Sequence, residues 1–306
     1  MNRKRVDRYL AALPAMSGKK VIITGANSGL GFECCRHLLG KGAHVVMACR
    51  NQEKMAAAAQ NLQSEFPAGQ ISTLIFDMGS LEAVEASVER IRQEQADFDV
   101  IIFNAGVFRP GKDLWYTPGV PLTSGTNFVA LLHAVTLLND FIAGTDQARK
   151  VIIQGSAASY FSPYKGMEKS LLDNNRPLMK QYNCSKLGSE CVFRHFQQAP
   201  HAANVRFGLC EPGACQTGVF RYSSPLYKLA VWFFTTCICF TARDGALPMT
   251  ALAAGDFPDG SYLAPRVFFH MRGLPGKRRF PRRFPVGKMI ADGYDIIHQL
   301  KHTHAL

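Results

Sequence analysis

The sequence predicts an α/β fold: a doubly wound, Rossmann-like parallel sheet with helices on both faces, in a single domain. Short β-branched runs alternate with segments of helical length, which is typical of βαβ units. A glycine-rich turn follows the first of these runs. The 306 residues, 47% apolar and 19% charged, are enough for one sizeable core. No stretch rich in Pro, Gly and Ser divides the chain into two domains.

Six runs of apolar and β-branched residues are predicted to be the strands of this sheet. They are Lys20–Thr24, His44–Ala48, Ile71–Phe76, Asp99–Phe103, Lys150–Gln154 and Asn204–Cys210. Helical patterns between them cover residues 29–40, 52–65, 80–95, 122–143 and 179–198. Beyond about Arg221 the alternation stops, and we expect a helix over Gly245–Ala254 and a short edge strand over Ser261–Ala264.

The chain ends are expected to lie outside the domain. The predicted domain covers residues 17–265 and includes an apolar substrate lid over 221–242. Residues 1–16 are a basic N-terminal extension. Residues 266–306 are a basic extension that is too rich in Pro and Arg for a core.

The net charge of +12 is concentrated at the two ends of the chain. Residues 1–20 carry +5 and residues 266–306 carry +7, so residues 21–265 are neutral overall. Charge runs at chain ends are usually solvated, and a neutral body argues against nucleic-acid binding. The basic ends favour a tail, or a weak contact with an anionic membrane surface.

Cysteine usage and the N-terminus predict a cytoplasmic protein without a metal site. The nine cysteines include no C-x-x-C pair and no zinc-ligand spacing, and their odd number favours reduced thiols. The N-terminus is charged where a signal peptide needs an apolar stretch. The longest uncharged apolar stretch, Leu229–Ala242, has 14 residues, whereas a bilayer-spanning helix needs about 20.

A glycine-rich turn lies between the first predicted strand and the first predicted helix. Glycines let backbone amides approach a pyrophosphate, and the positive end of a helix favours the negative charge. Three glycines alone are a weak signal, but the strand–turn–helix context strengthens it. The residues expected to cradle a dinucleotide are Gly25, Asn27, Ser28, Gly29, Leu30 and Gly31.

The end of the second strand indicates which dinucleotide binds. NAD-specific folds place a carboxylate about 20 residues after the glycines. No acidic residue occurs between Cys34 and Gln52, and Arg50 stands where the strand ends. Because a guanidinium pairs with a 2′-phosphate, the cofactor is predicted to be NADP(H). In the alternative interpretation, Arg50 is simply an exposed loop residue.

Tyr182 and Lys186 are four residues apart in a helical pattern, so their side chains project from one face. A neighbouring ammonium favours the phenolate, and the phenol can then exchange a proton with a carbonyl or alcohol oxygen. Ser156 follows the strand before this helix, at the sheet edge where open α/β folds place their sites. The pair alone is also compatible with an amphipathic helix that carries a half-buried tyrosine.

Over residues 17–265 the sequence resembles the short-chain dehydrogenase/reductase family. Three motifs carry this resemblance: the turn T-G-x-x-x-G-x-G, the Asn-Ala-Gly at residues 104–106 and the Tyr-x-x-x-Lys. Within this family, the sequence is most similar to the branch of retinol dehydrogenases and protochlorophyllide reductases. The similar features are the motifs TGANSGLG and ACRN and the long segment between Ser156 and Tyr182. Two residues depart from the family pattern. Phe103 stands where the family usually has an Asn, and Gly155 stands where a second Ser is frequent.

The resemblance implies roles for individual residues. Ser156, Tyr182 and Lys186 would be catalytic, with Asn127 holding a water next to the lysine. Asn104, Ala105 and Gly106 would line the adenosine side, Asp77 would contact the adenine, and Pro212, Gly213 and Thr217 would orient the nicotinamide amide.

Together these residues predict a short-chain NADP(H)-dependent alcohol dehydrogenase or carbonyl reductase. Hydride would pass between the nicotinamide and an apolar carbonyl or alcohol such as a retinoid, steroid or lipid-like compound. One alternative is a non-catalytic NADPH-binding sensor or scaffold. Another is a sugar-nucleotide epimerase, whose usual glycine spacing does not fit. For the apolar residues 223–240 there are two interpretations. In one, they form a helix that closes over the substrate, with its outer face on a membrane or a second subunit. In the other, they form a helix that is buried under the C-terminal segment.

Overall fold

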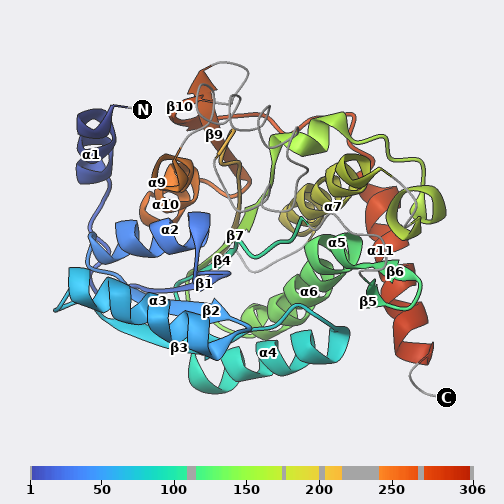
Figure 1. Ribbon diagram of the computed structural model, residues 1–306, viewed down its shortest axis with the longest axis horizontal. Coiled ribbons are helices and arrows are strands. Elements are labelled where there is room, and N and C mark those ends of the chain that lie inside the picture. Colours follow the sequence, from blue (N-terminus) through green and yellow to red (C-terminus); the bar gives the residue numbers. More distant parts are fainter. Residues whose placement is uncertain are drawn as a thin grey trace, which may run out of the picture.

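The computed structural model describes residues 2–108, 115–173, 177–199, 204–215, 241–267 and 272–303. Its centre is an eight-stranded sheet in the order β10-β9-β8-β7-β4-β1-β2-β3, parallel except for the β9–β10 pair (Figure 1). The strands are β1 (Lys20–Thr24), β2 (His44–Cys49), β3 (Ile71–Ile75), β4 (Val100–Phe103), β7 (Arg149–Gln154), β8 (Val205–Cys210), β9 (Ser261–Val267) and β10 (Arg272–Lys277). The predicted Rossmann-like α/β domain is confirmed.

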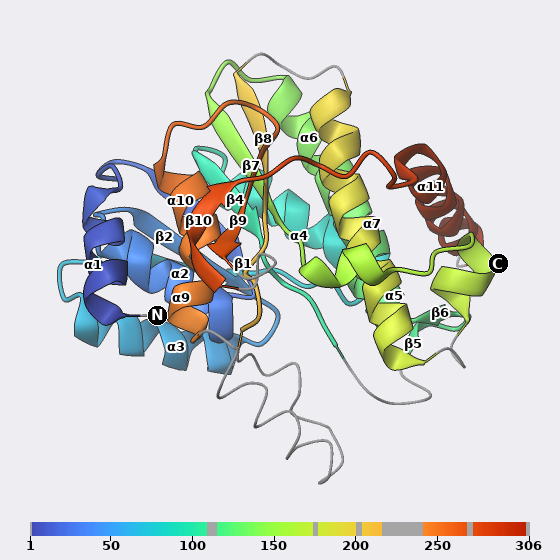
Figure 2. The ribbon, with the colours of Figure 1, turned by 90° about the horizontal axis from the view of Figure 1, so that it is seen from above.

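Helices cover both faces of the sheet (Figure 2). On one face lie α2 (Gly29–Leu39), α3 (Gln52–Glu65), α9 (Ala242–Gly245) and α10 (Leu247–Ala254); on the other lie α4 (Leu81–Glu94), α6 (Ala130–Ala143), α7 (Leu178–Gln198) and α11 (Val286–Thr303). Shorter elements are α5 (Leu122–Ser124), the π-helical η1 (Gly125–Val129), the 3-10 turn η2 (Ala157–Phe161), η3 (Glu168–Leu172) and the hairpin of β5 (Trp115–Thr117) and β6 (Val120–Pro121).

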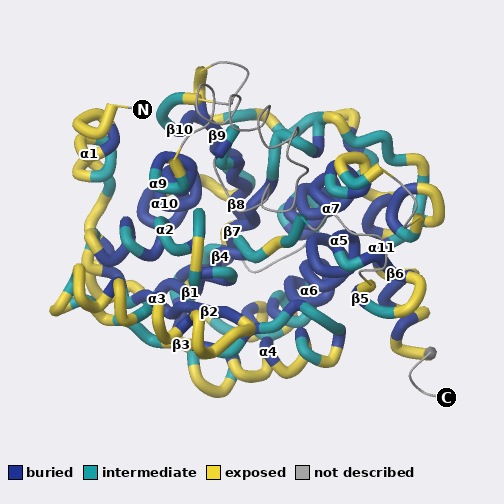
Figure 3. The backbone as a smooth tube through the Cα atoms, in the orientation of Figure 1, coloured by how far each residue is buried: buried dark blue, intermediate teal, exposed yellow. Residues whose placement is uncertain are grey.

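Alternation along the strands produces two cores. In β1, Ile22 packs into the core with α4, α6 and α7, whereas Val21 and Ile23 face α2 and α10. All three are fully buried, and Figure 3 shows the central strands as buried and the outer sides of α3 and α4 as exposed. Apolar residues therefore occur at successive positions of these strands, as expected for a parallel sheet that is covered on both faces.

The six predicted strands agree with the observed ones to within a residue at each end, but the prediction of a short edge strand over 261–264 is wrong. The expected edge strand is seven residues long and lies inside the sheet, because β10 pairs with its outer side. The helix predicted over 122–143 is present, and it contains the π-helical turn Gly125–Val129.

The C-terminal segment is not the solvated tail that its composition predicted. β10 extends the sheet, and α11 packs against α7 with Met289, Ile290 and Ile296 buried. Within α11, two lysines are balanced by two aspartates, and the apolar residues recur at helical spacing. The basic residues that precede the helix dominate the average composition of the segment, and this average conceals an amphipathic helix.

The basic N-terminal segment also contains a folded element, α1 (Arg3–Ala12). Val6 is fully buried, and the Lys41 ammonium donates to the main-chain oxygen of Leu10 at 3.0 Å. Asp7 forms an ion pair with Arg243 of α9. The N-terminal helix is thus attached to the same face of the sheet as α2.

One helical run among the described residues, Leu122–Ala143, is long and apolar enough to cross a membrane by length and composition. Because 67% of its apolar window is buried in the protein, this run matches a core helix. Of the apolar stretch Leu229–Ala242 identified in the sequence, residues 229–240 lie outside the described part of the chain.

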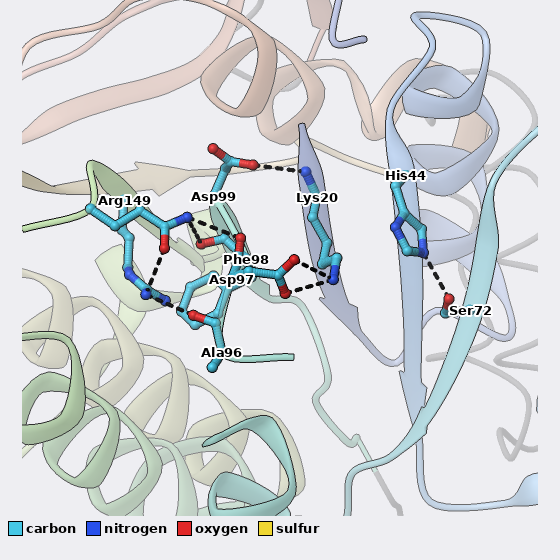
Figure 4. A network of polar contacts seen from close by, with 9 residues as sticks. Lys20, His44, Ser72, Ala96, Asp97, Phe98, Asp99 and Arg149 are labelled. Carbon is cyan, nitrogen blue, oxygen red and sulfur yellow. Dashed lines mark hydrogen bonds and ion pairs between the residues drawn. The ribbon is translucent and has the colours of Figure 1, made fainter. Parts of the chain in front are cut away.

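Polar contacts join the strands at their amino ends, opposite the candidate site (Figure 4). The Lys20 ammonium bonds both carboxylate oxygens of Asp97 at 2.6 and 2.7 Å, and its main-chain N–H donates to Asp99. Arg149, almost fully buried, donates to the main-chain oxygen of Ala96 at 2.7 Å. These contacts fix the starts of β1, β4 and β7 and leave the carboxyl ends free for other chemistry.

Candidate active site

The sequence-predicted site residues gather along the carboxyl edge of the sheet. They follow the strands directly: Gly25 after β1, Arg50 after β2, Asp77 after β3, Asn104 after β4, Ser156 after β7 and Pro212 after β8. The strand order reverses between β1 and β4, because the chain leaves β3 at one edge and returns to the other side of β1. Open α/β sheets bind ligands in the crevice at such a reversal.

The glycine turn has the geometry that a dinucleotide cradle requires. Gly25 and Gly29 have φ values of +66° and +58°, a region that favours glycine. A Cβ on Gly31 would lie 2.5 Å from the main-chain oxygen of Gly25, so only glycine permits this approach. Ser28 caps α2 without a side-chain hydrogen bond, and the space beside Gly29 is open. The glycine turn and the amino end of α2, where no side chain of the described residues bonds the first main-chain N–H groups, fit a pyrophosphate.

Asn104 braces this turn from the next strand. Its side-chain amide donates to the Thr24 main-chain oxygen at 2.9 Å. The Thr24 hydroxyl accepts the main-chain N–H groups of Asn104 and Ala105, each at 3.0 Å. Sequence reasoning did not single out Thr24, although a threonine at the end of a strand beside a glycine turn is the residue that can make these bonds.

Arg50 and Asp77 lie on the same edge but in different surroundings. Arg50 is exposed just before Asn51, which caps α3, and its guanidinium forms no ion pair within the described ranges. The Asp77 carboxylate is half-buried and accepts the Gly79 main-chain N–H at 3.0 Å. Arg50 is therefore available to an added phosphate, whereas Asp77 already orders its own loop.

Tyr182 and Ser156 meet at the centre of the site. The Ser156 hydroxyl hydrogen-bonds Tyr182, and the ring of Phe108 packs edge-on against the tyrosine, with 5.1 Å between centroids. Burial raises the pKa of Tyr182, and the Ser156 hydrogen bond only partly opposes the rise. Tyr182 therefore carries its proton at neutral pH, as a general acid must.

Lys186 is buried one helical turn after Tyr182. Its ammonium donates to the main-chain oxygen of Gln154 at 3.2 Å. Burial lowers its pKa to about 8. A Cβ on Gly106 would lie 3.5 Å from the Lys186 nitrogen and 3.1 Å from Asn127 Oδ1. Gly106 therefore leaves room beside the lysine.

Asn127 reaches this space from the π-helical turn, a distortion that is frequent at functional sites. Its side-chain amide bonds the main chain of Val107 twice, accepting at 2.7 Å and donating at 2.8 Å. It also donates to the Ser185 hydroxyl at 3.0 Å. The asparagine joins the end of β4 to the helix that carries Tyr182 and Lys186.

Pro212 and Gly213 follow β8 on the same edge, and Gly213 has a φ of +73°. Thr217, predicted to orient the nicotinamide, lies outside the described residues, as do residues 221–240 of the predicted lid. Sequence reasoning also missed two buried carboxyl groups, Glu190 and Glu211, which lie under the site. The signal for Glu190 was an acidic residue at an inward-facing position of its helix.

Comparison with known proteins places the chain in a family. Residues 19–226 match the family model described as short chain dehydrogenase. The chain belongs to the short-chain dehydrogenase family. The family of oxidoreductases inferred from the motifs is therefore confirmed, and its named relatives include those of the expected branch.

Among these short-chain dehydrogenases, mouse retinol dehydrogenase 14 is 29% identical over 274 residues, covering 83% of this chain and 78% of the mouse protein. The protochlorophyllide reductase of Chlamydomonas reinhardtii is 32% identical over 246 residues, covering 72% of this chain and 62% of the algal one. A solved structure from Mycobacterium paratuberculosis superposes with a TM-score of 0.72 at 28% identity, covering 95% and 96% of the two chains.

Proposed function

We propose that this short-chain dehydrogenase is an NADP(H)-dependent alcohol dehydrogenase or carbonyl reductase with Tyr182 as its general acid and base. The observation that carries the proposal is the half-buried Tyr182, hydrogen-bonded to Ser156 and followed one turn later by Lys186. A protein that only binds a dinucleotide has no need of a phenol held beside a hydroxyl and an ammonium.

The proposed reaction assigns one task to each side chain. When bound, the nicotinamide supplies or accepts the hydride at the substrate carbon. In the reducing direction, Tyr182 donates its proton to the carbonyl oxygen, which becomes the hydroxyl of the product. Ser156 hydrogen-bonds that oxygen and holds it in line with the phenol. Lys186 stabilises the resulting phenolate by its charge, and Asn127 fixes the main chain beside the lysine.

Arg50 and the absence of a carboxylate after β2 support NADP(H) as the cofactor. Two neighbours of the same fold were solved with related cofactors: an alcohol dehydrogenase of Thermococcus sibiricus with 5-hydroxy-NADP, TM-score 0.59, and a gluconate 5-dehydrogenase of Burkholderia cenocepacia with NADP and tartrate, TM-score 0.60. At 20% and 19% identity they share only the fold, so the choice of cofactor rests on Arg50.

For the substrate, we propose an apolar carbonyl or alcohol of the retinoid, steroid or lipid-like class. The names of the relatives, retinol dehydrogenase and protochlorophyllide reductase, describe enzymes for large apolar molecules and support this class. A peripheral contact with an anionic membrane, a second subunit over residues 223–240 and a cytoplasmic location stay predictions.

The experiment is an NADPH-oxidation screen of the purified protein against apolar aldehydes and ketones of increasing length, with short polar carbonyls as controls. We expect turnover with at least one apolar carbonyl and a lower KM for the longer ones. NADPH binding without oxidation of any member of the panel would instead support the non-catalytic sensor or scaffold.

A further inference from the structure

Two glutamates lie beneath the active site. Glu190 is in α7, four residues after Lys186, and Glu211 follows β8. The side chains of both are completely buried. The helix α7 packs against β7 and β8, the strands that lead to Ser156 and Pro212 (Figure 2). Buried carboxyl groups are costly unless they are hydrogen-bonded, so their partners indicate their role.

Glu190 holds the main chain that carries Ser156. The main-chain N–H of Ser156 donates to Glu190 Oε1 at 3.1 Å, while Lys186 bonds the oxygen of Gln154 two residues earlier. One turn of α7 therefore grips two consecutive peptide groups, one on each side of Gly155.

Gly155 is what allows this approach. A Cβ at this position would lie 2.8 Å from Glu190 Oε1 and 3.1 Å from its Cγ. The departure from the family pattern, in which a second serine is frequent here, thus has a physical partner in Glu190. The glycine and the glutamate fit each other.

Glu211 has donors for both of its oxygens. The Tyr262 hydroxyl donates to Oε1, and Arg278 donates to Oε2 at 3.2 Å in an ion pair. The guanidinium of Arg278 also lies over the ring of Tyr160, 5.1 Å from its centroid. Glu211 is therefore suited to be the ionised member of the pair.

Within the described part of the chain, Glu190, in contrast, does not have a donor of standard geometry for each of its carboxyl oxygens. Its Oε2 is buried and has no hydrogen bond of standard geometry among the described residues, and the Ser159 hydroxyl is the one neutral side-chain donor beside the carboxyl group there. The carboxyl group of Glu211 lies within hydrogen-bonding reach of Glu190. Two facing carboxylates repel, whereas a proton on Glu190 would complete a hydrogen bond to Glu211.

We propose that Glu190 and Glu211 share one proton, held on Glu190, and that Glu190 is a positioning residue that fixes the Ser156 main chain for the reaction. The second half of this inference rests on the proposed function, whereas the shared proton does not. The pKa of Glu190 agrees with this assignment: burial and the Glu211 charge raise it well above its usual range, against the opposing effects of Ser156, Ser159 and Lys186.

The shared proton can be tested without any substrate, by infrared spectroscopy at neutral pH. A protonated carboxylic acid has a C=O band that a carboxylate lacks. We expect this band in the wild type and its loss in Glu190→Gln, with no loss in the control Glu94→Gln, which changes an exposed glutamate. A wild-type spectrum without the band, or a band unchanged in Glu190→Gln, overturns the shared proton.

The positioning role is tested with two variants at the same residue. Glutamine imitates the protonated acid, since it can accept from Ser156 and donate to Glu211, so Glu190→Gln should keep kcat within about threefold. Leucine offers no acceptor, so Glu190→Leu should lower kcat at least about tenfold, because small misplacements of a reacting group are costly. NADPH affinity should stay unchanged in both, because Ser156 acts on the substrate oxygen.

The outcomes separate the two proposals. Equal kcat values for the leucine variant and the wild type overturn the positioning role, as does a loss in the glutamine variant equal to that in the leucine variant. Should the leucine variant fail to fold, the glutamine variant and the infrared band still decide. If the wild type reduces no carbonyl, the proposed function and the positioning role fail, while the infrared band still tests the shared proton.

Discussion

Single residues decide the chemistry of this site, and their surroundings set the protonation state of each. Tyr182, Lys186 and Ser156 were predictable because their spacing within one helix and after one strand is a local pattern. The protonation state of Tyr182 was not, because it depends on burial that only the folded chain creates. Glu190 and Glu211 were missed for the same reason: they are far apart in sequence and meet only in the fold.

At Arg50, the prediction concerns the choice of cofactor. Arg50→Ala should weaken NADPH binding by about 10- to 100-fold, since a charge-assisted hydrogen bond contributes about 1.5–3 kcal/mol, and should leave NADH binding almost unchanged. Fluorescence titration with both cofactors measures this. Lys54→Ala, which removes an exposed cation in the next helix, is the control. Equal losses for NADPH and NADH would show that Arg50 does not contact the 2′-phosphate.

At the scale of elements, the strands were predictable and the C-terminal elements were not. A fully buried parallel strand appears in the sequence as an unbroken apolar run, which is why β1 was predicted without error. β10 contains two glycines and a proline, so its pairing with β9 leaves no comparable pattern. For α11, the apolar spacing was missed because the Pro- and Arg-rich residues 272–283 that precede the helix dominated the composition of the segment.

The docking of α11 can be tested at a glycine. A Cβ on Gly293 would lie 2.6 Å from Leu132 Cδ2 and 2.6 Å from Phe128 Cζ, so this helix approaches α6 and η1 closely. Gly293→Val should therefore lower the free energy of unfolding by about 1–3 kcal/mol, the usual cost of overpacking. Denaturant unfolding measures the change.

The matched control is Gly287→Ala in the first turn of the same helix, where a Cβ meets nothing within 4 Å. This change should be neutral or slightly stabilising, because alanine favours a helix. If Gly293→Val is as stable as the wild type, α11 does not pack on this surface in solution.

At the scale of the whole molecule, the basic excess belongs to folded elements as well as to the chain ends. α1 carries four basic residues and one acidic residue, whereas α11, at the opposite end of the molecule, has two lysines balanced by two aspartates (Figures 1 and 2). The sheet between them has an amino edge closed by ion pairs and a carboxyl edge where six strand ends present the site. Catalysis is therefore expected to depend on the assembled sheet.

The most direct test of this account is Tyr182→Phe, measured as NADPH affinity and turnover on the best substrate of the carbonyl screen. Phenylalanine keeps the ring against Phe108 but has no proton to donate. Turnover should fall at least about a hundredfold, as the loss of a general acid implies, while the dissociation constant of NADPH stays within about threefold. Turnover close to that of the wild type would contradict the assignment of Tyr182 as the acid and base, and with it the proposed mechanism.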